Sequence, residues 1–394
     1  MLKLIKGGTV FAPEEMGRQD ILTAGGQIVK IARNISIPTD LEVKVIKADG
    51  KTVVPGFIDS HVHITGAGGS EGPASRTHEV SFSALAKAGL TTVVGTLGID
   101  TISFNLQHLL VTALALEQQG ISTYIYTGGY QLPPKTILDS VLSDISLIEK
   151  VVGVKVAIFD ALSSHPGKEA LVTLASQTWL GGRLGGKAGL VHFHIGDTNG
   201  SFVDLANVLK GMGLPTGMFV TTHINRSAEV LGRAVAGGKE GLSLDITALY
   251  TPDRNMKQTV APAKALRILL DEGIPLENIT MSSDSNAAYP FKDEAGVLED
   301  IILTPVNAVA VELRKAVKQE GFSLDEVLKI VTVNPAQRLR LARRKGSLTP
   351  GKDADIVILD EDLQVDTVLA KGQVILKEKA PIVKGYFEDD YKSI

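Results

Sequence analysis

The sequence predicts an α/β protein, a (β/α)8 TIM-type barrel with a small β-sandwich built from both chain ends. In the middle of the chain, eight apolar strand-like segments alternate with segments whose apolar residues have helical spacing. Parallel strands covered on both faces are apolar throughout, and eight such units match a closed barrel. A doubly wound open sheet is the alternative, but no GxGxxG opens the first unit.

The two chain ends have the second pattern, short strands separated by turns. The segments LKLIKGGTVF, QDILTAGGQIVKIA and LEVKVIKADG are punctuated by Gly-Gly and Asp-Gly pairs, as a β-meander requires. The same pattern of short strands and turns returns in ADIVILDEDLQVDTVLAKGQVILKEKAPIV near the other end. We therefore expect residues 1–54 and 344–394 to form the sandwich, and residues 55–343 to form the barrel.

The expected barrel elements follow in chain order. The eight strands are FIDSHVH, TTVVGTL, TYIYTG, VGVKVAIF, LVHFHIG, MFVTTHI, LSLDIT and ITMSSDS. The helical segments between them include SFSALAKAGL, TILDSVLSDISLIEKV, EALVTLASQTWL, FVDLANVLKG and SAEVLGRAVAGG. Two longer helices follow the eighth strand, and the second begins with a capping box formed by Ser323 and Glu326.

The composition excludes several classes of function. The 394 residues include 40 Lys and Arg against 44 Asp and Glu, without a basic stripe, so neither nucleic acid nor an anionic membrane is an expected partner. The absence of cysteine excludes disulfides and thiolate metal ligands. No apolar run reaches about 18 residues, and the first apolar stretch is too short for a signal peptide. We expect a cytoplasmic location.

Two histidines end the first barrel strand. Residues two apart on a strand point to the same face, so the imidazoles of His61 and His63 converge. Convergent imidazoles are typical of a metal site. The alternative is a strand whose histidines alternate without binding anything.

Further polar residues lie at the same ends of other strands, where (β/α)8 barrels place their active sites. They are Lys155 on the fourth strand, His194 on the fifth, His223 on the sixth and Asp284 on the eighth. One assembled site explains this placement better than separate accidents. His192 shares a face with His194, which we favour as the ligand because it is nearer the strand end. His223 and Asp284 could instead cap the following helices.

Lys155 lies in an apolar strand, which is costly for an ammonium group. A buried lysine is a neutral amine base, a paired cation or a modified residue. Reaction with carbon dioxide would give a carbamate with two anionic oxygens. Such a group could bridge two cations about 3.5–4 Å apart, the separation found in two-metal hydrolytic sites.

Several motifs resemble a known family. PGFIDSHVH, NPAQRLRL and GSLTPGKDADIVILD are similar to the amidohydrolase superfamily, whereas GVKVAIFD, HIGD, THINR, VAPAKALRILLDEGIPL and SSDSN resemble its isoaspartyl (β-aspartyl) dipeptidases. The resemblance implies a barrel with a small sandwich and two divalent metal ions, zinc, bridged by carboxylated Lys155. The implied ligands are His61 and His63 for one ion, His194 and His223 for the other, and Asp284 completing the first.

The resemblance also implies an activity, hydrolysis of the β-aspartyl amide bond of dipeptides by a hydroxide that bridges the metals. Asp284 would take the proton of this nucleophile and pass it to the leaving amine. Tyr130 would donate a hydrogen bond to the developing oxyanion, and Arg226 would bind a substrate carboxylate. The expected partners are a small peptide or amide substrate and further copies of the chain in a homo-oligomer.

Four positions depart from the dipeptidase pattern, and all concern substrate recognition. Ser70 stands where the family has a glutamate that binds the substrate amino group, although a loop shift could bring Glu71 there. Leu162 replaces an arginine, Ile99 a threonine and Ala288 a serine. A binuclear amidohydrolase of other specificity, for a cyclic amide or an N-acyl amino acid, is therefore the alternative function. A non-enzymatic scaffold is a third, which the complete ligand set disfavours.

Overall fold

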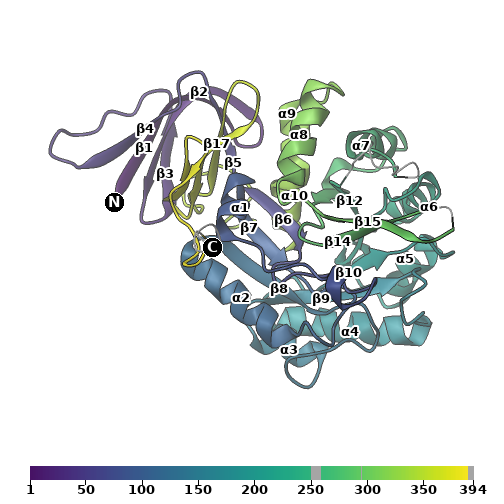
Figure 1. The fold of residues 1–394 in the computed structure, drawn as a ribbon. Helices are drawn as coiled ribbons and strands as arrows, with labels where there is room; N and C mark the ends of the chain where they lie inside the picture. Colours follow the sequence, from purple (N-terminus) through teal and green to yellow (C-terminus); the bar gives the residue numbers. More distant parts are fainter. Residues whose placement is uncertain (250–258, 294, 389–394) are drawn as a thin grey trace.

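The barrel prediction is confirmed by the computed structural model, which describes residues 1–249, 259–293 and 295–388 (Figure 1). Each of the eight predicted segments overlaps one strand, to within one residue at its start, of a parallel sheet with the order β13-β12-β11-β10-β9-β8-β7-β6. These strands are β6 (Phe57–Val62), β7 (Leu90–Gly95), β8 (Ser122–Gly128), β9 (Val151–Ile158), β10 (Leu190–Ile195), β11 (Phe219–Thr222), β12 (Ser243–Thr247) and β13 (Ile279–Ser282).

The first and last strands of this sheet approach each other and nearly close the barrel. Val62 on β6 forms a parallel bridge with Ser285, just after β13, and the backbone N–H of His63 donates to the Ser285 carbonyl at 3.0 Å. Every residue of β6, β7 and β9 is buried. This burial on both faces explains why the strands read as continuous apolar runs with few polar interruptions.

Helices cover the outside of the barrel between successive strands (Figure 1). The segment expected to be helical over residues 136–151 is helical only at its centre, because Ile148–Lys150 turn directly into β9. The predicted capping box of Ser323 and Glu326 is present at the start of α9. The helices are α1 (Phe82–Lys87), α2 (Leu106–Gln119), α3 (Val141–Leu147), α4 (Lys168–Gly185), α5 (Phe202–Gly211), α6 (Ala228–Lys239), α7 (Pro262–Asp271), α8 (Ala308–Lys318), α9 (Leu324–Val331) and α10 (Val333–Arg338).

Strands from both chain ends pair in a second, nine-stranded sheet, as the predicted sandwich requires. A register shift between Ile5 and Gly8 lets the first half of β1 pair with β4 and its second half with β5. The pairing of β5 with β16 joins the two ends of the chain. The strands are β1 (Leu2–Phe11), β2 (Glu15–Ala24), β3 (Gln27–Ala32), β4 (Val43–Lys47), β5 (Thr52–Pro55), β16 (Ile356–Leu359), β17 (Val365–Ala370), β18 (Gln373–Lys377) and β19 (Ala380–Pro381).

This sheet encloses an apolar core of its own, separate from the main core of the barrel. Its members include Ile5, Ile21, Val53, Ile356 and Leu369, so both chain ends contribute. The domain limits at residues 54 and 344 stay a prediction, and residues 389–394 lie outside the described part of the chain.

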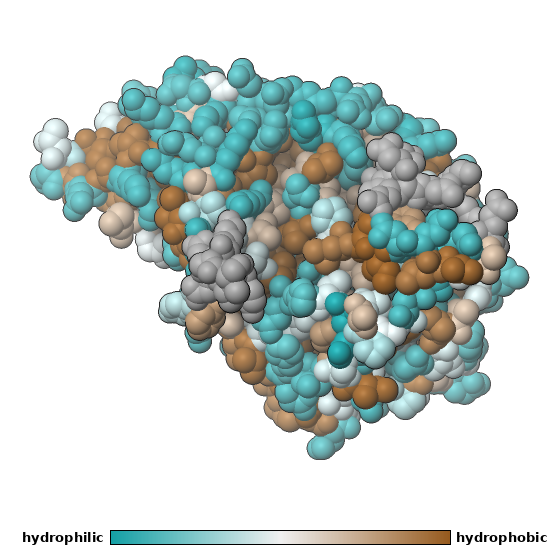
Figure 2. All heavy atoms as spheres, viewed as in Figure 1, coloured by the Kyte–Doolittle hydropathy of each residue, from teal (hydrophilic) through white to brown (hydrophobic). Residues whose placement is uncertain are grey.

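A two-stranded antiparallel hairpin, β14 (Ala288–Lys292) and β15 (Leu298–Leu303), follows the last barrel strand and was not predicted. Its apolar side chains are partly exposed, with Leu298 at 40% and Leu303 at 57%, and Figure 2 shows apolar surface over this region. Such an exposed pair of strands lacks the buried apolar run by which the barrel strands were recognised. None of the helices in the described residues is long and apolar enough to span a membrane.

Candidate active site and metal centre

The residues predicted to form the site lie toward the carboxyl ends of their strands. His61 is in β6 and His63 directly follows it, while Lys155 is in β9 and His194 in β10. His223 follows β11, and Asp284 lies two residues beyond β13. The parallel order of the strands brings these side chains into one region of the barrel mouth.

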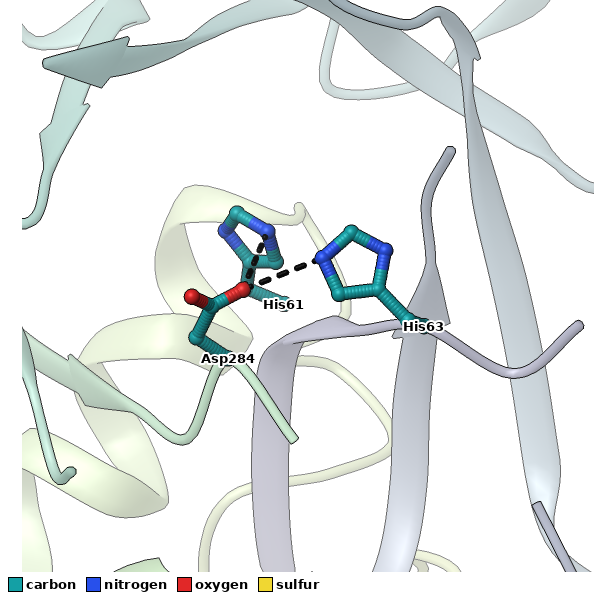
Figure 3. A group of neighbouring side chains, drawn as sticks. All are labelled: His61, His63 and Asp284. Carbon is teal, nitrogen blue, oxygen red and sulfur yellow. Dashed lines mark hydrogen bonds and ion pairs between the residues drawn. The ribbon is translucent and has the colours of Figure 1, made fainter. Parts of the chain in front are cut away.

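His61, His63 and Asp284 form one half of this constellation (Figure 3). Oδ1 of Asp284 lies 3.2 Å from Nε2 of His61 and 3.0 Å from Nε2 of His63. One ligand atom from each residue can be chosen so that all three lie within 4.8 Å of one another. Two imidazole nitrogens and a carboxylate oxygen are a donor set that suits zinc.

The remaining candidates are adjacent to this group. Nζ of Lys155 lies 3.3 Å from Nε2 of His61 and donates to the Leu97 carbonyl at 2.9 Å. The ring of His223 lies 5.2 Å from that of His61 and 4.5 Å from that of His194. The structure therefore brings all six predicted ligands together, with Lys155 next to the first pair and His194 next to His223.

The protein holds the second nitrogens of two imidazoles, those of His63 and His223. Nδ1 of His63 is 3.1 Å from the Thr96 carbonyl, and Nδ1 of His223 is 2.7 Å from the Thr247 hydroxyl. Nε2 of His223 is buried and has no hydrogen-bond partner among the described residues. A buried polar atom without a partner is costly, and metal-ligating histidines usually have their other nitrogen fixed in this way. The site therefore fits a metal ion.

The protonation states also fit ligation. Burial lowers the pKa of His61 and His223 well below the usual value, and it lowers that of His194 to about 4 despite a hydrogen bond with Asp160. Burial raises the pKa of Asp284, but His223, His63 and Lys155 outweigh it and hold this pKa below its usual value. At neutral pH the site therefore offers neutral imidazoles and an ionised carboxylate, the forms that bind metals.

Comparison with known proteins agrees with this geometry. The Amidohydrolase family model matches residues 191–375. The crystal structure of a β-aspartyl dipeptidase from Fervidobacterium islandicum AW-1, in complex with the β-Asp-Leu dipeptide, superposes with a TM-score of 0.91 at 34% identity, covering 98% of this chain and 99% of that one. The chain belongs to the β-aspartyl dipeptidase family of the amidohydrolases. It is a hydrolase that acts on amide bonds.

More distant relatives include dihydroorotases. That of Streptococcus pneumoniae serotype 4 is 26% identical over 393 residues, covering 91% of this chain and 90% of its own length. That of Anoxybacillus flavithermus is 37% identical over 95 residues, and this match spans 24% of the present chain and 21% of the dihydroorotase. Both similarities agree with membership of the amidohydrolases.

Two buried carboxylates, Asp59 and Asp245, accept hydrogen bonds from the ligand residues of this amidohydrolase or from their neighbours in the chain. Asp59 accepts the backbone N–H groups of His61 and Ser283, which links the HxH strand to the segment that carries Asp284. Asp245 accepts hydroxyl hydrogen bonds from both neighbouring strands, from Thr222 on β11 and from Thr280 and Ser282 on β13. Sequence reasoning missed both, because a single acidic residue in an apolar run does not reveal its partners.

His192 also contacts a ligand residue, but through His61 and not in the manner of His194. Its Nε2 lies 3.0 Å from Nδ1 of His61, and its ring stacks on Tyr126 at a centroid distance of 4.9 Å. The side chain is fully buried. If Nε2 of His61 binds a metal, Nδ1 carries the hydrogen and His192 accepts it.

Replacing His192 with phenylalanine is therefore expected to weaken metal affinity by roughly 10- to 100-fold. Phenylalanine keeps the stack on Tyr126 but has no acceptor for His61. Competition with a chelator measures the affinity. His192→Gln places an amide near the position of Nε2 and is expected to restore part of the loss. Wild-type affinity in His192→Phe would contradict the contact's role.

The stability of the metal-free enzyme should depend on pH. Burial lowers the pKa of His192 to about 3 and that of His194 to about 4, against 6.5 for an ordinary histidine. At pH values between these folded values and 6.5, the unfolded chain binds more protons than the folded protein. The free energy of unfolding therefore falls as the pH falls below 6.5. Burial raises the pKa of Asp59 to about 7 and also raises that of Asp245, which opposes the trend. The other shifted histidines act with the first two: His61, His63 and His223.

We expect the histidines to outweigh the two carboxyl groups. From pH 6.5 to pH 5, His192 and His194 should each lower the free energy of unfolding by about 2 kcal/mol. The net loss should be on the order of a few kcal/mol after the opposing carboxyl groups are included. Urea unfolding of metal-stripped protein at the two pH values measures the change. Equal or greater stability at pH 5 would show that the imidazoles are not held neutral.

The predicted substrate-binding residues fall into two groups. Tyr130 and Arg226 lie at the ligand cluster: the Tyr130 hydroxyl is 3.0 Å from Nε2 of His194, and Arg226 is in the loop that follows His223. Asp160, which the sequence reasoning missed, lies 3.4 Å from the same nitrogen of His194. Its position just after β9 was the available signal, since strand ends carry the other site residues.

Glu71 belongs to the second group, because its carboxylate is already paired. Oε1 of Glu71 lies 2.9 Å from Nζ of Lys292 at the end of β14. Ser70 is exposed, as is Leu162, whereas Ile99 and Ala288 are partly buried. In the described part of the chain no contact places Glu71 or Ser70 at the ligand cluster, so their substrate-binding roles stay predictions.

Proposed function

We propose that this amidohydrolase hydrolyses the β-aspartyl amide bond of dipeptides in a metal-dependent reaction. The observation that carries the proposal is the convergence of His61, His63, His194, His223, Lys155 and Asp284. It is strengthened by 34% identity to a dipeptidase whose crystal structure holds β-Asp-Leu.

Two zinc ions would be held by these residues, His61 and His63 with Asp284 on one side and His194 and His223 on the other. The metals would supply Lewis acidity and lower the pKa of water. Lys155 would link the two sides as a carbamate. Burial lowers the pKa of Lys155 to about 8, so part of the amine is neutral near physiological pH and can attack carbon dioxide.

The protein's own groups would perform the remaining work. Asp284 would accept the proton of the attacking water on its carboxylate and deliver it to the leaving nitrogen. The Tyr130 hydroxyl would donate a hydrogen bond to the carbonyl oxygen as negative charge develops there. Arg226, whose side chain is 26% exposed, would bind the terminal carboxylate of the dipeptide.

A second function, an amidohydrolase of other specificity, is favoured by the state of the predicted recognition residues. The carboxylate of Glu71 is paired with Lys292, and Leu162 and Ile99 cannot form the ionic and hydrogen-bond contacts of the residues they replace. A site that loses such contacts is expected to lose affinity for charged substrates. The predicted homo-oligomer also stays a proposal.

Hydrolysis of β-Asp-Leu by zinc-loaded protein with bicarbonate present tests the proposal. We expect cleavage of β-Asp-Leu, little cleavage of α-Asp-Leu, and loss of activity after chelation. Dihydroorotate, a hydantoin and an N-acyl amino acid form the comparison panel. Cleavage of one of these amides without β-Asp-Leu would replace the first function by the second.

A further inference from the structure

Two carboxylates face the proposed substrate anchor, Arg226. Its Nη1 atom lies 3.6 Å from Oδ2 of Asp197 and 3.9 Å from Oδ2 of Asp160. Both distances exceed those of a hydrogen bond, so neither carboxylate occupies the guanidinium in the manner of a bidentate pair. The N–H donors of Arg226 remain able to receive a carboxylate while two negative charges stay nearby.

These groups extend from the ligand cluster toward solvent. Asp160 is close to Nε2 of His194, and its side chain is 13% exposed. Asp197 lies two residues beyond β10, and its side chain is 73% exposed. Burial raises the pKa of Tyr289 on β14, and Arg226 and Asp197 act on this pKa with opposite signs, so the hairpin is near enough to feel both charges. This region adjoins His194 and Tyr130. Under the proposed function, in which Arg226 binds the terminal carboxylate, it would receive the leaving half of a bound dipeptide.

The charge balance of this region distinguishes among leaving groups. A substrate carboxylate on Arg226 would compete with Asp160 and Asp197 for the guanidinium, and among the described residues neither carboxylate has another Lys or Arg side chain within 4 Å. An apolar side chain on the same amino acid would do nothing to offset their negative charges. An acidic side chain would add repulsion, whereas a cationic one would restore attraction, and the partly buried position of Asp160 limits solvent screening.

We propose that the leaving-group side of the site selects dipeptides whose C-terminal amino acid has a cationic side chain, lysine or arginine. Arg226 binds the α-carboxylate, and Asp197, with Asp160 behind it, receives the side-chain cation. The two charges of such an amino acid are separated by a flexible chain that can reach both groups. This inference rests on the proposed function, because it assigns the leaving half of a β-aspartyl dipeptide.

Competing turnover of β-Asp-Lys, β-Asp-Arg, β-Asp-Leu and β-Asp-Glu by the zinc-loaded enzyme tests the inference. We expect kcat/KM for the two basic dipeptides to exceed that for β-Asp-Leu by at least about 10-fold, with β-Asp-Glu the poorest. The preference should shrink as ionic strength rises, because Asp197 is exposed. We call kcat/KM for β-Asp-Lys divided by that for β-Asp-Leu the Lys-to-Leu ratio. Asp197→Asn should reduce this ratio to within about threefold of unity.

Glu229→Gln is the matched control. The Glu229 side chain is 72% exposed, nearly the same as Asp197, but its carboxylate is paired with Arg233 on α6. The same charge is removed, and the Lys-to-Leu ratio is expected to persist.

The possible results separate the inference from the function beneath it. Cleavage of β-Asp-Leu with a ratio near one, or a ratio that survives Asp197→Asn, would overturn the inference and leave the proposed function intact. Failure to cleave any β-aspartyl dipeptide would overturn both. A high ratio that collapses in Asp197→Asn and persists in Glu229→Gln would support both.

Discussion

Replacing Lys155 with methionine is expected to lower kcat/KM by about 1,000-fold or more, because the amine is proposed to become the ligand shared by both metal ions. Its Nζ atom lies 3.3 Å from Nε2 of His61, so the change removes a group at the centre of the site. Metal content and kcat are measured on the same sample. Intact mass or carbon-13 NMR in labelled bicarbonate reports the added carbon dioxide in the wild-type protein and its absence in the variant.

The Lys155→Met variant should fold, since methionine fills a similar volume without a buried amine. Lys345 provides the contrasting control, because it is also buried but lies 2.6 Å from Asp355 and 3.0 Å from Asp353. Lys345→Met leaves the buried carboxylate of Asp355 without its cation, although Asp353 keeps its ion pair with Arg344, and should cost about 3–5 kcal/mol of stability. Its folded fraction should still bind metal. Two bound metals and wild-type kcat in Lys155→Met would refute the bridging role.

Replacing Asp284 with asparagine is expected to lower kcat by about 100- to 10,000-fold, the range typical of a lost general acid or base. Asparagine preserves the shape of the side chain but cannot accept the proton of the attacking water. Asp284 has a φ of 51°, in the left-handed region that asparagine tolerates better than most residues. The backbone conformation should therefore be preserved, and the loss of kcat should reflect the lost proton transfer.

The decisive measurement for Asp284→Asn is kcat together with metal content, since the residue is also a proposed ligand. A protein that retains metal and loses kcat supports the proton-transfer role, whereas equal losses of metal and kcat would assign Asp284 to ligation alone. Asp325→Asn, in the first turn of α9, makes the same chemical change at a residue outside the ligand cluster and should retain kcat. Wild-type kcat in Asp284→Asn would contradict both roles.

Much of the barrel was predictable because its signals are local. A parallel strand buried on both faces is largely apolar along its length, so a few consecutive residues are enough to identify it. The same locality identified the capping box at Ser323 and the convergence of His61 with His63, since both depend on spacing along one element. Lys155 was visible because an ammonium group in an apolar run has few alternatives.

The β14–β15 hairpin shows where this reasoning stops. Its strands are partly exposed, and their apolar pattern alone cannot show that they pair after the last barrel strand. The pairing of Glu71 with Lys292 depends on that hairpin, because the two residues are far apart in the sequence. Sequence reasoning had left Glu71 open to substrate, and only the arrangement of the loops shows its partner.

The sequence by itself determined the order of the barrel strands and the residues at their carboxyl ends, because hydrophobic burial and strand periodicity act over short stretches. Only the tertiary structure decided that His192 contacts His61, that Asp59 links β6 to the segment after β13, and that two carboxylates face Arg226. These contacts join residues that are distant in the chain. Their distances are set by strand register and loop conformation, which no local pattern specifies.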